Sequence, residues 1–324
     1  MLSGRIAVLV SFDWPRALAW RLRQQLLDPV GTDSVEGVVR RLGAVQAQLD
    51  SAADLAIRTG RKGSRSGEVA DALAEGRIIK TVAFRGATHL MTPEEGGVYL
   101  ALRATSRMWE LPSWQSFYRL KPADWPALRE AAREALADGP RTRPERGVAI
   151  TARSRFRRNA CHRGAYFRAY RPATPDHVHY WLGDGLGAGR KRIQAWIAGL
   201  GDRLTAVDIE GETAYVLCED LDELAASLPT IALRLLPGYD QWVLGPGTAD
   251  ARVVAPARRA IVSRGANIVI LGGVVSGTWS LSRDRVAISW FAEGGRPPLP
   301  AIEAEVARLA AIVDRDLRPS LQTV

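Results

Sequence analysis

The chain has 324 residues, 47% of them apolar, which is enough for a substantial buried core and predicts more than one domain. No apolar run approaches the roughly 20 residues of a membrane-spanning helix, no signal peptide is expected at the N-terminus, and two cysteines are too few for a disulfide framework. The net charge of +9 favours a polyanionic partner, and a reducing cytoplasm is the expected compartment.

The positive charge is concentrated in one segment of the chain. Ten arginines and one acid, Glu145, lie between Arg141 and Arg171, so the remaining 34 basic and 34 acidic residues cancel. Charge alone gives equal weight to a solvated loop and to an arm that contacts phosphates. Thr151 to Arg163 carries few large apolar residues and many like charges, and we expect it to be the least ordered part of the chain.

Residues 11–110 have the pattern of a winged helix-turn-helix module. Helical stretches precede two β-rich strands, which are joined by a tight turn at Arg85-Gly86. The predicted elements are a helix opened by Asp13 and Pro15, a helix capped by Ser34, an extended segment from Val45 to Ala53, a helix ending near Glu75, and the strands between Ile78 and Met91. Thr92-Pro93-Glu94-Glu95 is a capping box that starts a helix predicted to reach Trp109.

Residues 111–164 form a second region, which the sequence pattern defines poorly. Only one helix is clear, opening at Asp124-Trp125-Pro126 and ending at Asp138-Gly139. The Arg-rich segment that follows has no clear helical or strand periodicity.

A third winged-helix module is predicted from 165 to 228. Thr174-Pro175-Asp176 caps one helix, and the next begins with Arg190, Lys191 and Arg192. Strands from Leu204 to Ile209 and from Ala214 to Leu217 flank a turn and form the wing. Basic residues at the start of the helix that begins at Arg190 lie where a recognition helix contacts DNA.

Residues 229–324 are predicted to form a C-terminal antiparallel β-rich region with a terminal helix. The expected strands are Ile231 to Leu236, Asn267 to Leu271, Val274 to Leu281 and Val286 to Phe291. Ile302, Val306, Leu309 and Ile312 give the final helix its apolar face. The predicted fold class is therefore α+β, with tandem winged helix-turn-helix modules before this region.

Motifs spread over most of the chain resemble, in the right order, those of the AlkZ and YcaQ family of winged-helix DNA glycosylases. They are Leu42 to Gln48 (LGAVQAQ) with Ser51-Ala52, Phe84 to Leu90 (FRGATHL), Tyr170 to Gly183, Arg234 to Gly245 (RLLPGYDQWVLG), and Gly277-Thr278-Trp279. The resemblance implies three winged helices that cradle DNA, the second of them a shortened winged-helix region at residues 111–164. It also implies catalysis at Gln46 and Gln48, and substrates that are alkylated purines, including bulky adducts and interstrand crosslinks.

The spacing of Gln46 and Gln48 fits a shared site, because side chains two apart on an extended segment point the same way. Taken alone, the pair is more simply two amides on a solvated strand face. Amides suit one class of glycosidic bond. An N3- or N7-alkylated purine is cationic and already a good leaving group. The enzyme then needs only to hold a water near the anomeric carbon and to stabilise an oxocarbenium-like transition state. An unmodified base would demand more acid catalysis.

The other candidate groups carry weaker signals. Arg85 and His89 in the first wing are candidates for DNA contacts, although a buried, hydrogen-bonded histidine is equally compatible with the sequence. His177 and His179 are two apart on a helix and do not face each other, so no metal site is expected, and no cofactor either.

Two hypotheses of different class result. The first is a monomeric glycosylase that acts on double-stranded DNA, away from membranes, in the nucleoid-containing cytoplasm. The alternative is a non-catalytic winged-helix DNA-binding protein or regulator, or a degenerate family member without activity. Release of alkylpurine would identify the enzyme, and a sequence-specific footprint would identify the regulator.

Overall fold

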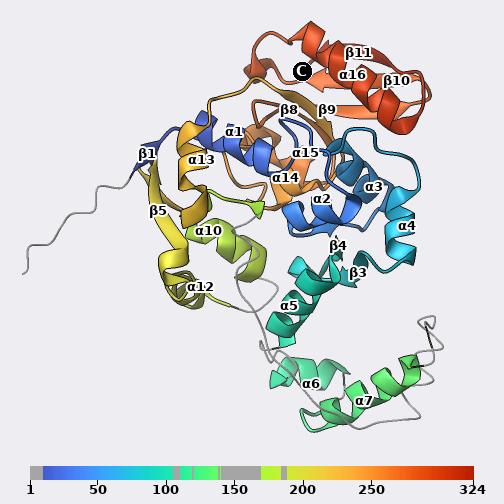
Figure 1. Cartoon of the computed structure of the whole chain (residues 1–324), viewed down its shortest axis with the longest axis vertical. Coiled ribbons are helices and arrows are strands. Elements are labelled where there is room, and N and C mark those ends of the chain that lie inside the picture. Colours follow the sequence, from blue (N-terminus) through green and yellow to red (C-terminus); the bar gives the residue numbers. More distant parts are fainter. Residues whose placement is uncertain (1–9, 105–109, 119, 138, 140–168, 184–187) are drawn as a thin grey trace, which may run out of the picture. The chain divides into compact units, whose positions relative to one another are not determined.

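The computed structural model describes residues 10–104, 110–118, 120–137, 139, 169–183 and 188–324 (Figure 1). Residues 140–168, which include the segment predicted to be least ordered and most of the Arg-rich stretch, lie outside the described residues. The chain forms two compact units, one made of residues 1–97 and 163–324 and the other of residues 98–162. No helix among the described residues is both long enough and apolar enough to cross a membrane.

The described residues of the larger unit form three sheets surrounded by helices, which confirms the predicted α+β class. Its N-terminal part begins with strand β1 (Ser11–Phe12) and helix α1 (Trp14–Gln24). As the sequence predicts, Asp13 caps α1 by accepting a hydrogen bond from the Arg16 N–H at 2.7 Å. The elements that follow are α2 (Val35–Leu42), β2 (Val45–Gln46), α3 (Asp50–Thr59), α4 (Glu68–Ala74), β3 (Ile79–Val82), a single turn at Phe84–Gly86, and β4 (Thr88–Met91).

Strands β2, β4 and β3 form one antiparallel sheet, with β4 in the centre. Gln46 is the direct partner of His89 across this sheet. The predicted turn is present, because Arg85 and Gly86 both have positive φ, 51° and 75°. Apolar side chains from α2, α3, α4, β2 and β4 pack into one core beneath the sheet.

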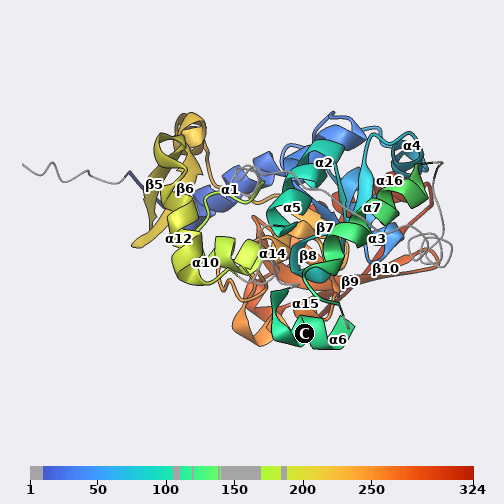
Figure 2. The ribbon, with the colours of Figure 1, turned by 90° about the horizontal axis from the view of Figure 1, so that it is seen from below.

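Helix α1 packs away from this sheet, against the region predicted as the third module. That region contains α10 (Pro175–Val178), a π-helical turn (His179–Gly183), α12 (Arg190–Ala198), β5 (Leu204–Ile209), β6 (Glu212–Leu217) and α13 (Leu221–Ala226). Strand β1 pairs with β5 in parallel, and Trp14, Ala17 and Trp20 enter a core with residues of β5, β6 and α13. Figure 2 shows α1 beside the β5–β6 hairpin.

The C-terminal region is built on a five-stranded sheet in the order β11-β10-β9-β8-β7. Its elements are β7 (Leu233–Leu236), α14 (Gln241–Leu244), α15 (Arg259–Ser263), β8 (Asn267–Leu271), β9 (Val274–Ser282), β10 (Arg285–Trp290), α16 (Leu299–Val313) and β11 (Arg318–Thr323). Alternate residues of β8 face opposite sides: Ile268 and Ile270 pack toward α1 and α14, and Val269 packs toward α16. Both faces of the sheet are therefore covered.

Two sequence predictions about this region need correction. The sheet is not purely antiparallel, because β11 pairs with β10 in parallel, and α16 is followed by this strand instead of ending the fold. The physical reason is the connection: α16 returns the chain across the sheet between β10 and β11, and such a crossover places the second strand parallel to the first.

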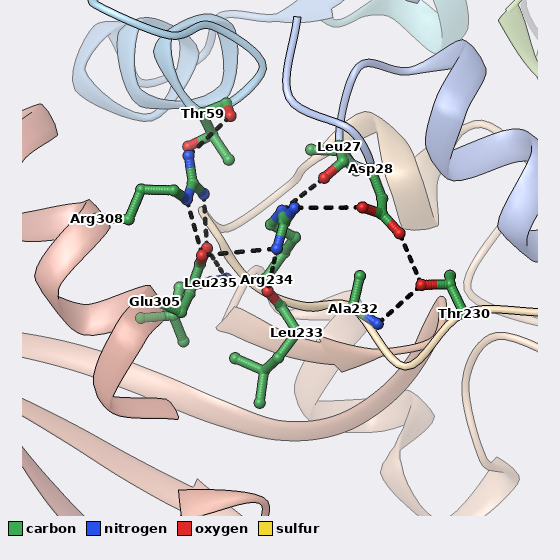
Figure 3. Close-up of polar contacts among 10 residues, drawn as sticks. All are labelled: Leu27, Asp28, Thr59, Thr230, Ala232, Leu233, Arg234, Leu235, Glu305 and Arg308. Atoms are coloured by element: carbon green, nitrogen blue, oxygen red, sulfur yellow. Dashed lines mark hydrogen bonds and ion pairs between the residues drawn. The ribbon is translucent and has the colours of Figure 1, made fainter. Parts of the chain in front are cut away.

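A polar network joins α1, α3 and the C-terminal sheet (Figure 3). The carboxylate of Glu305 on α16 accepts hydrogen bonds from the Leu235 N–H at 3.0 Å and from Arg308 at 2.6 and 2.7 Å. Arg308 also donates to the Thr59 carbonyl oxygen, and Arg234 donates to that of Leu27 at 2.6 Å. The buried Glu305 and the two partly buried arginines thus fix the segment after α1 and the end of α3 against β7 and α16.

The smaller unit contains the end of α5 (Pro93–Ala104), α6 (Pro112–Tyr118) and α7 (Asp124–Leu136). At the start of α5, which belongs to the larger unit, the Thr92 hydroxyl accepts a hydrogen bond from the Glu95 N–H at 3.4 Å, as expected for a capping residue. Helix α7 begins at the predicted position, and α6 was not predicted.

Candidate functional site

A pocket of about 380 Å³ lies within the larger unit, and its walls come from distant parts of the sequence. One wall is β2 with the residue pair that follows it, a second is the β3–β4 wing, a third is the π-helical turn, and a fourth spans residues 239–263. A volume of this size falls in the range of small-molecule and nucleobase-sized sites.

Gln46 and Gln48 form the first wall. Ala47 between them is buried and its N–H donates to the Thr88 carbonyl oxygen at 2.7 Å, so the flanking glutamines point the other way, into the pocket. Gln46 Nε2 donates to Gln48 Oε1 at 2.9 Å. Gln46 is half-buried and Gln48 is exposed, which places one amide deeper than the other.

A cluster of rings forms the second wall. Phe84 stacks on Trp181 with centroids 4.4 Å apart, and His89 meets Phe84 edge-on at 5.5 Å. His89 is buried, with a relative exposure of only 2%. Burial, together with a smaller effect of the Arg85 charge, lowers the pKa of His89 from 6.5 to about 4. Because the Ala87 carbonyl oxygen can only accept, the 3.0 Å contact puts the proton of the neutral ring on Nδ1.

Arg85 and Tyr180 link the wing to the π-helical turn. The Arg85 guanidinium lies over the Tyr180 ring at 4.3 Å and donates a hydrogen bond to its hydroxyl. The Tyr180 ring also approaches Gly247, whose φ is +99° and where a Cβ atom would come within 3.0 Å of the ring. Glycine at 247 therefore lets the ring fit, and Arg85 is held in place by a stacked partner.

The fourth wall was missed by sequence reasoning. It consists of Tyr239, Leu244, Thr248, Arg259 and Ser263. Tyr239 has φ +61° and its hydroxyl donates to the Arg264 carbonyl oxygen at 3.1 Å. Only the Gly238-Tyr239 turn within the RLLPGYDQWVLG motif offered a signal for this wall.

The basic start of α12 does not line the pocket. Arg190 is exposed and pairs with Asp176 at 2.9 Å, and Lys191 and Arg192 are exposed beside it. His177 is buried and its Nε2 contacts Asp250 at 3.2 Å, so its role here is a structural one between α10 and the 247–252 loop. Among the described residues, no group of three His, Cys, Asp or Glu side chains could hold a metal ion.

Comparison with known proteins shows which family this chain resembles. The family described as DNA glycosylase AlkZ-like matches residues 39–163 and 149–312. An interstrand DNA cross-link repair glycosylase from Streptomyces sahachiroi is 32% identical over 355 residues, which cover 92% of this chain and 95% of the relative. The solved structure of the Streptomyces sahachiroi DNA glycosylase AlkZ matches with a TM-score of 0.84 at 29% identity, covering 97% of this chain and 100% of that chain.

These matches define the protein as a DNA glycosylase, an enzyme that hydrolyses N-glycosidic bonds in DNA. More particularly, the chain belongs to the AlkZ-like DNA glycosylase family. The family predicted from the sequence motifs is thereby confirmed.

Proposed function

We propose that this glycosylase releases N3- and N7-alkylated purines from double-stranded DNA, with Gln46 and Gln48 as its catalytic residues. The observation that carries the proposal is the pair of amides, 2.9 Å apart, on the wall of a 380 Å³ pocket. The described residues that line this pocket include no Asp or Glu, and His89 is neutral near pH 7. Such a site has no obvious group for protonating an ordinary base.

A cationic alkylpurine does not need that proton, because its leaving group is already activated. The remaining tasks are to hold a water near the anomeric carbon and to orient dipoles toward the positive charge that develops on the sugar. Amide groups can perform both tasks, since the carbonyl oxygen accepts from water and stabilises a nearby cation.

The hydrogen bond between the two amides leaves one oxygen for this work. With Gln46 Nε2 donating to Gln48 Oε1, Gln46 Oε1 has no partner among the described residues. If both amides are rotated, the direction reverses and Gln48 Oε1 is left instead. In either arrangement the pair presents one carbonyl oxygen that can accept from the attacking water.

We further propose that two parts of the larger unit are winged helices that bind duplex DNA. Supporting this, α2, β2, α3, α4 and the β3–β4 hairpin follow the order helix, strand, helix, helix, wing. The stretch from α10 to β6 likewise ends in a helix and a hairpin, and α12 begins with three cations. Arg85, His89, Arg190, Lys191 and Arg192 remain our candidates for DNA contacts, and the protein is expected to act as a monomer at the nucleoid.

Interstrand crosslinks are part of the proposal. The relative from Streptomyces sahachiroi is named as a repair glycosylase for them, and the pocket of the present chain is open to solvent at Gln48. A bulky adduct can then extend outward while its glycosidic bond lies near the amides.

Substitution of the glutamines tests the catalytic assignment. Gln46→Ala and Gln48→Ala should each lower single-turnover release of an N7-alkylpurine by about 10²-fold, the scale for losing one positioned hydrogen-bonding group. DNA affinity should change much less, because the amides are uncharged and phosphates dominate binding. Gln48→Asp should retain part of the activity, since a carboxylate also accepts from water.

A gel-shift assay on the same alkylated duplex serves as the control for binding. Alanine variants that match the wild-type rate would show that the catalytic assignment is wrong. A folded, DNA-bound wild type that releases no base from any alkylated duplex would favour a non-catalytic DNA-binding role.

A further inference from the structure

We propose that Arg259, together with the hydroxyls of Ser263 and Thr248, binds a phosphate of the DNA strand that carries the target nucleotide. The inference rests on the proposed function, because it assumes that the 380 Å³ pocket receives that nucleotide. It adds a DNA contact from the C-terminal region, away from the predicted winged-helix modules.

Among the described residues that line the pocket, Arg259 is the cation without a protein partner. Its guanidinium is exposed and makes no hydrogen bond, ion pair or ring contact within the described residues, although it lines the pocket. The other lining cation, Arg85, is occupied by the ring and hydroxyl of Tyr180. Among the described lining residues there is also no carboxylate that could neutralise Arg259 in the free enzyme.

The preceding residue shows what a structural arginine looks like at this place. Arg258 donates two hydrogen bonds to the Glu293 carboxylate, at 2.6 and 2.9 Å, and stacks on Phe291 at 4.2 Å. Two adjacent arginines thus differ completely in their surroundings. Arg258 is held by a carboxylate and a ring, and Arg259 faces the pocket with five donors that have no partner in the described part of the chain.

Two hydroxyls extend the same donor surface. Ser263 lies four residues after Arg259 on α15, hence on the same face, and it also lines the pocket. Its Oγ is 2.8 Å from Thr248 Oγ1. One of these hydroxyls donates to the other, and the accepting hydroxyl keeps its own proton for a further oxygen.

A guanidinium fork beside a free hydroxyl proton matches the oxygens of a phosphodiester. A cationic alkylpurine is excluded as the group on Arg259 by charge repulsion. A phosphate on this wall would fix the strand while the amides on the other wall act on the sugar. In this arrangement Arg259 binds a DNA phosphate, and Gln46 and Gln48 catalyse cleavage of the glycosidic bond.

The test compares Arg259→Ala with Arg264→Ala in the full-length protein. Arg264 is exposed, lies five residues after Arg259 and does not line the pocket. Its replacement by alanine therefore removes an equal charge without removing the proposed phosphate contact. Arg259→Ala should weaken binding to an alkylated duplex by roughly tenfold and reduce the log–log salt slope by about 0.9, the value for one phosphate contact. Arg264→Ala should change affinity by less than about twofold, and Arg259→Lys should be intermediate.

Neutral methylphosphonate linkages, placed one at a time around the lesion, identify the phosphate. One position should weaken binding of the wild type but cause no further loss in Arg259→Ala. The proposal is overturned if Arg259→Ala behaves like Arg264→Ala, or if it loses affinity equally at every methylphosphonate position. Thermal unfolding checks that both variants are folded, and Arg259→Lys provides a second comparison if Arg259→Ala is not.

This test is separate from that of the catalytic assignment. At saturating enzyme, Arg259→Ala should still release base within about threefold of the wild-type rate, because the contact acts in binding. If the catalytic assignment fails while the phosphate contact holds, the Gln46 and Gln48 variants keep the wild-type rate and Arg259→Ala still weakens binding. If the phosphate contact fails while the catalytic assignment holds, the glutamine variants lose rate and Arg259→Ala binds DNA like Arg264→Ala.

Discussion

At the scale of single residues, the pocket depends on groups that do not change charge near neutral pH. His89 is the clearest case, because burial among Phe84 and Trp181 moves its pKa to about 4. Its imidazole therefore stays neutral beside Gln46 on the neighbouring strand. A neutral ring adds no positive charge to a site that we propose for a cationic base.

The lowered pKa of His89 makes a prediction about stability. An unfolded chain binds a proton at His89 near pH 6.5 but the folded protein does so only near pH 4, so stability falls as pH drops through this window. At pH 5 this single group should lower the free energy of unfolding by about 2 kcal/mol relative to pH 7.5. Urea unfolding of the wild type and His89→Gln at the two pH values measures the difference.

His177 also has a pKa lowered by burial, so part of the wild-type pH dependence should persist in His89→Gln. The prediction concerns the difference between the two proteins. Equal losses of stability from pH 7.5 to pH 5 in both would contradict it.

At the scale of elements, helix α12 combines exposure with positive charge. Ile193 and Ile197 bury one face, and Lys191 and Arg192 remain exposed at its start. Arg190 differs from them because Asp176 on the preceding helix holds its guanidinium. Lys191 and Arg192, which have no ion-pair partner in the part of the chain that the structure describes, are therefore the better candidates for phosphate contacts.

Replacing these cations should change the salt dependence of DNA binding. Lys191→Ala and Arg192→Ala should each lower the log–log salt slope by about 0.9 if each contacts one phosphate. Arg285→Ala, an exposed arginine on β10, provides a control of equal charge. Fluorescence anisotropy from 50 to 200 mM salt measures the slopes, and a control variant with the same loss would point to a diffuse charge effect.

At the scale of the whole molecule, the larger unit depends on contacts between segments far apart in sequence. Tyr170 illustrates this, since its hydroxyl contacts the Leu42 carbonyl oxygen and Gln241 Oε1, both at 3.0 Å. Gly245 makes room for the ring, because a Cβ atom there would lie 2.1 Å from it. On the other side of the sheet, the Glu305 network of Figure 3 likewise joins segments that are far apart in sequence.

Loss of Glu305 should therefore destabilise the unit as a whole. Its side chain is only 4% exposed and lies between Arg234 and Arg308, so Glu305→Ala leaves two cations without their shared carboxylate. Breaking a buried pair of this kind costs about 3–5 kcal/mol. Urea denaturation should show that loss, whereas Glu303→Ala, exposed on the same helix, should stay within about 0.5 kcal/mol of the wild type. Similar values for both variants would exclude the network as a source of stability.

The sequence by itself determined the local features of this protein. Capping residues Asp13, Ser34 and Thr174 mark helix starts, and the period of two in Gln46 and Gln48 is enough to predict that they share a face. These features depend on neighbours within a few residues, which a sequence displays directly. The motifs around them were also sufficient to predict the family.

Only the tertiary structure decided what meets across the chain. The parallel strand β11, the packing of α1 against β5 and β6, and the wall formed by Tyr239, Arg259 and Ser263 all bring together residues that are distant in sequence. Such contacts depend on the burial of whole helix and sheet faces and on how the chain connects the elements, so local periodicity in the sequence does not predict them. Arg258 and Arg259 show the limit: they are identical neighbours in the sequence, and only folding gives one a carboxylate and the other an open pocket.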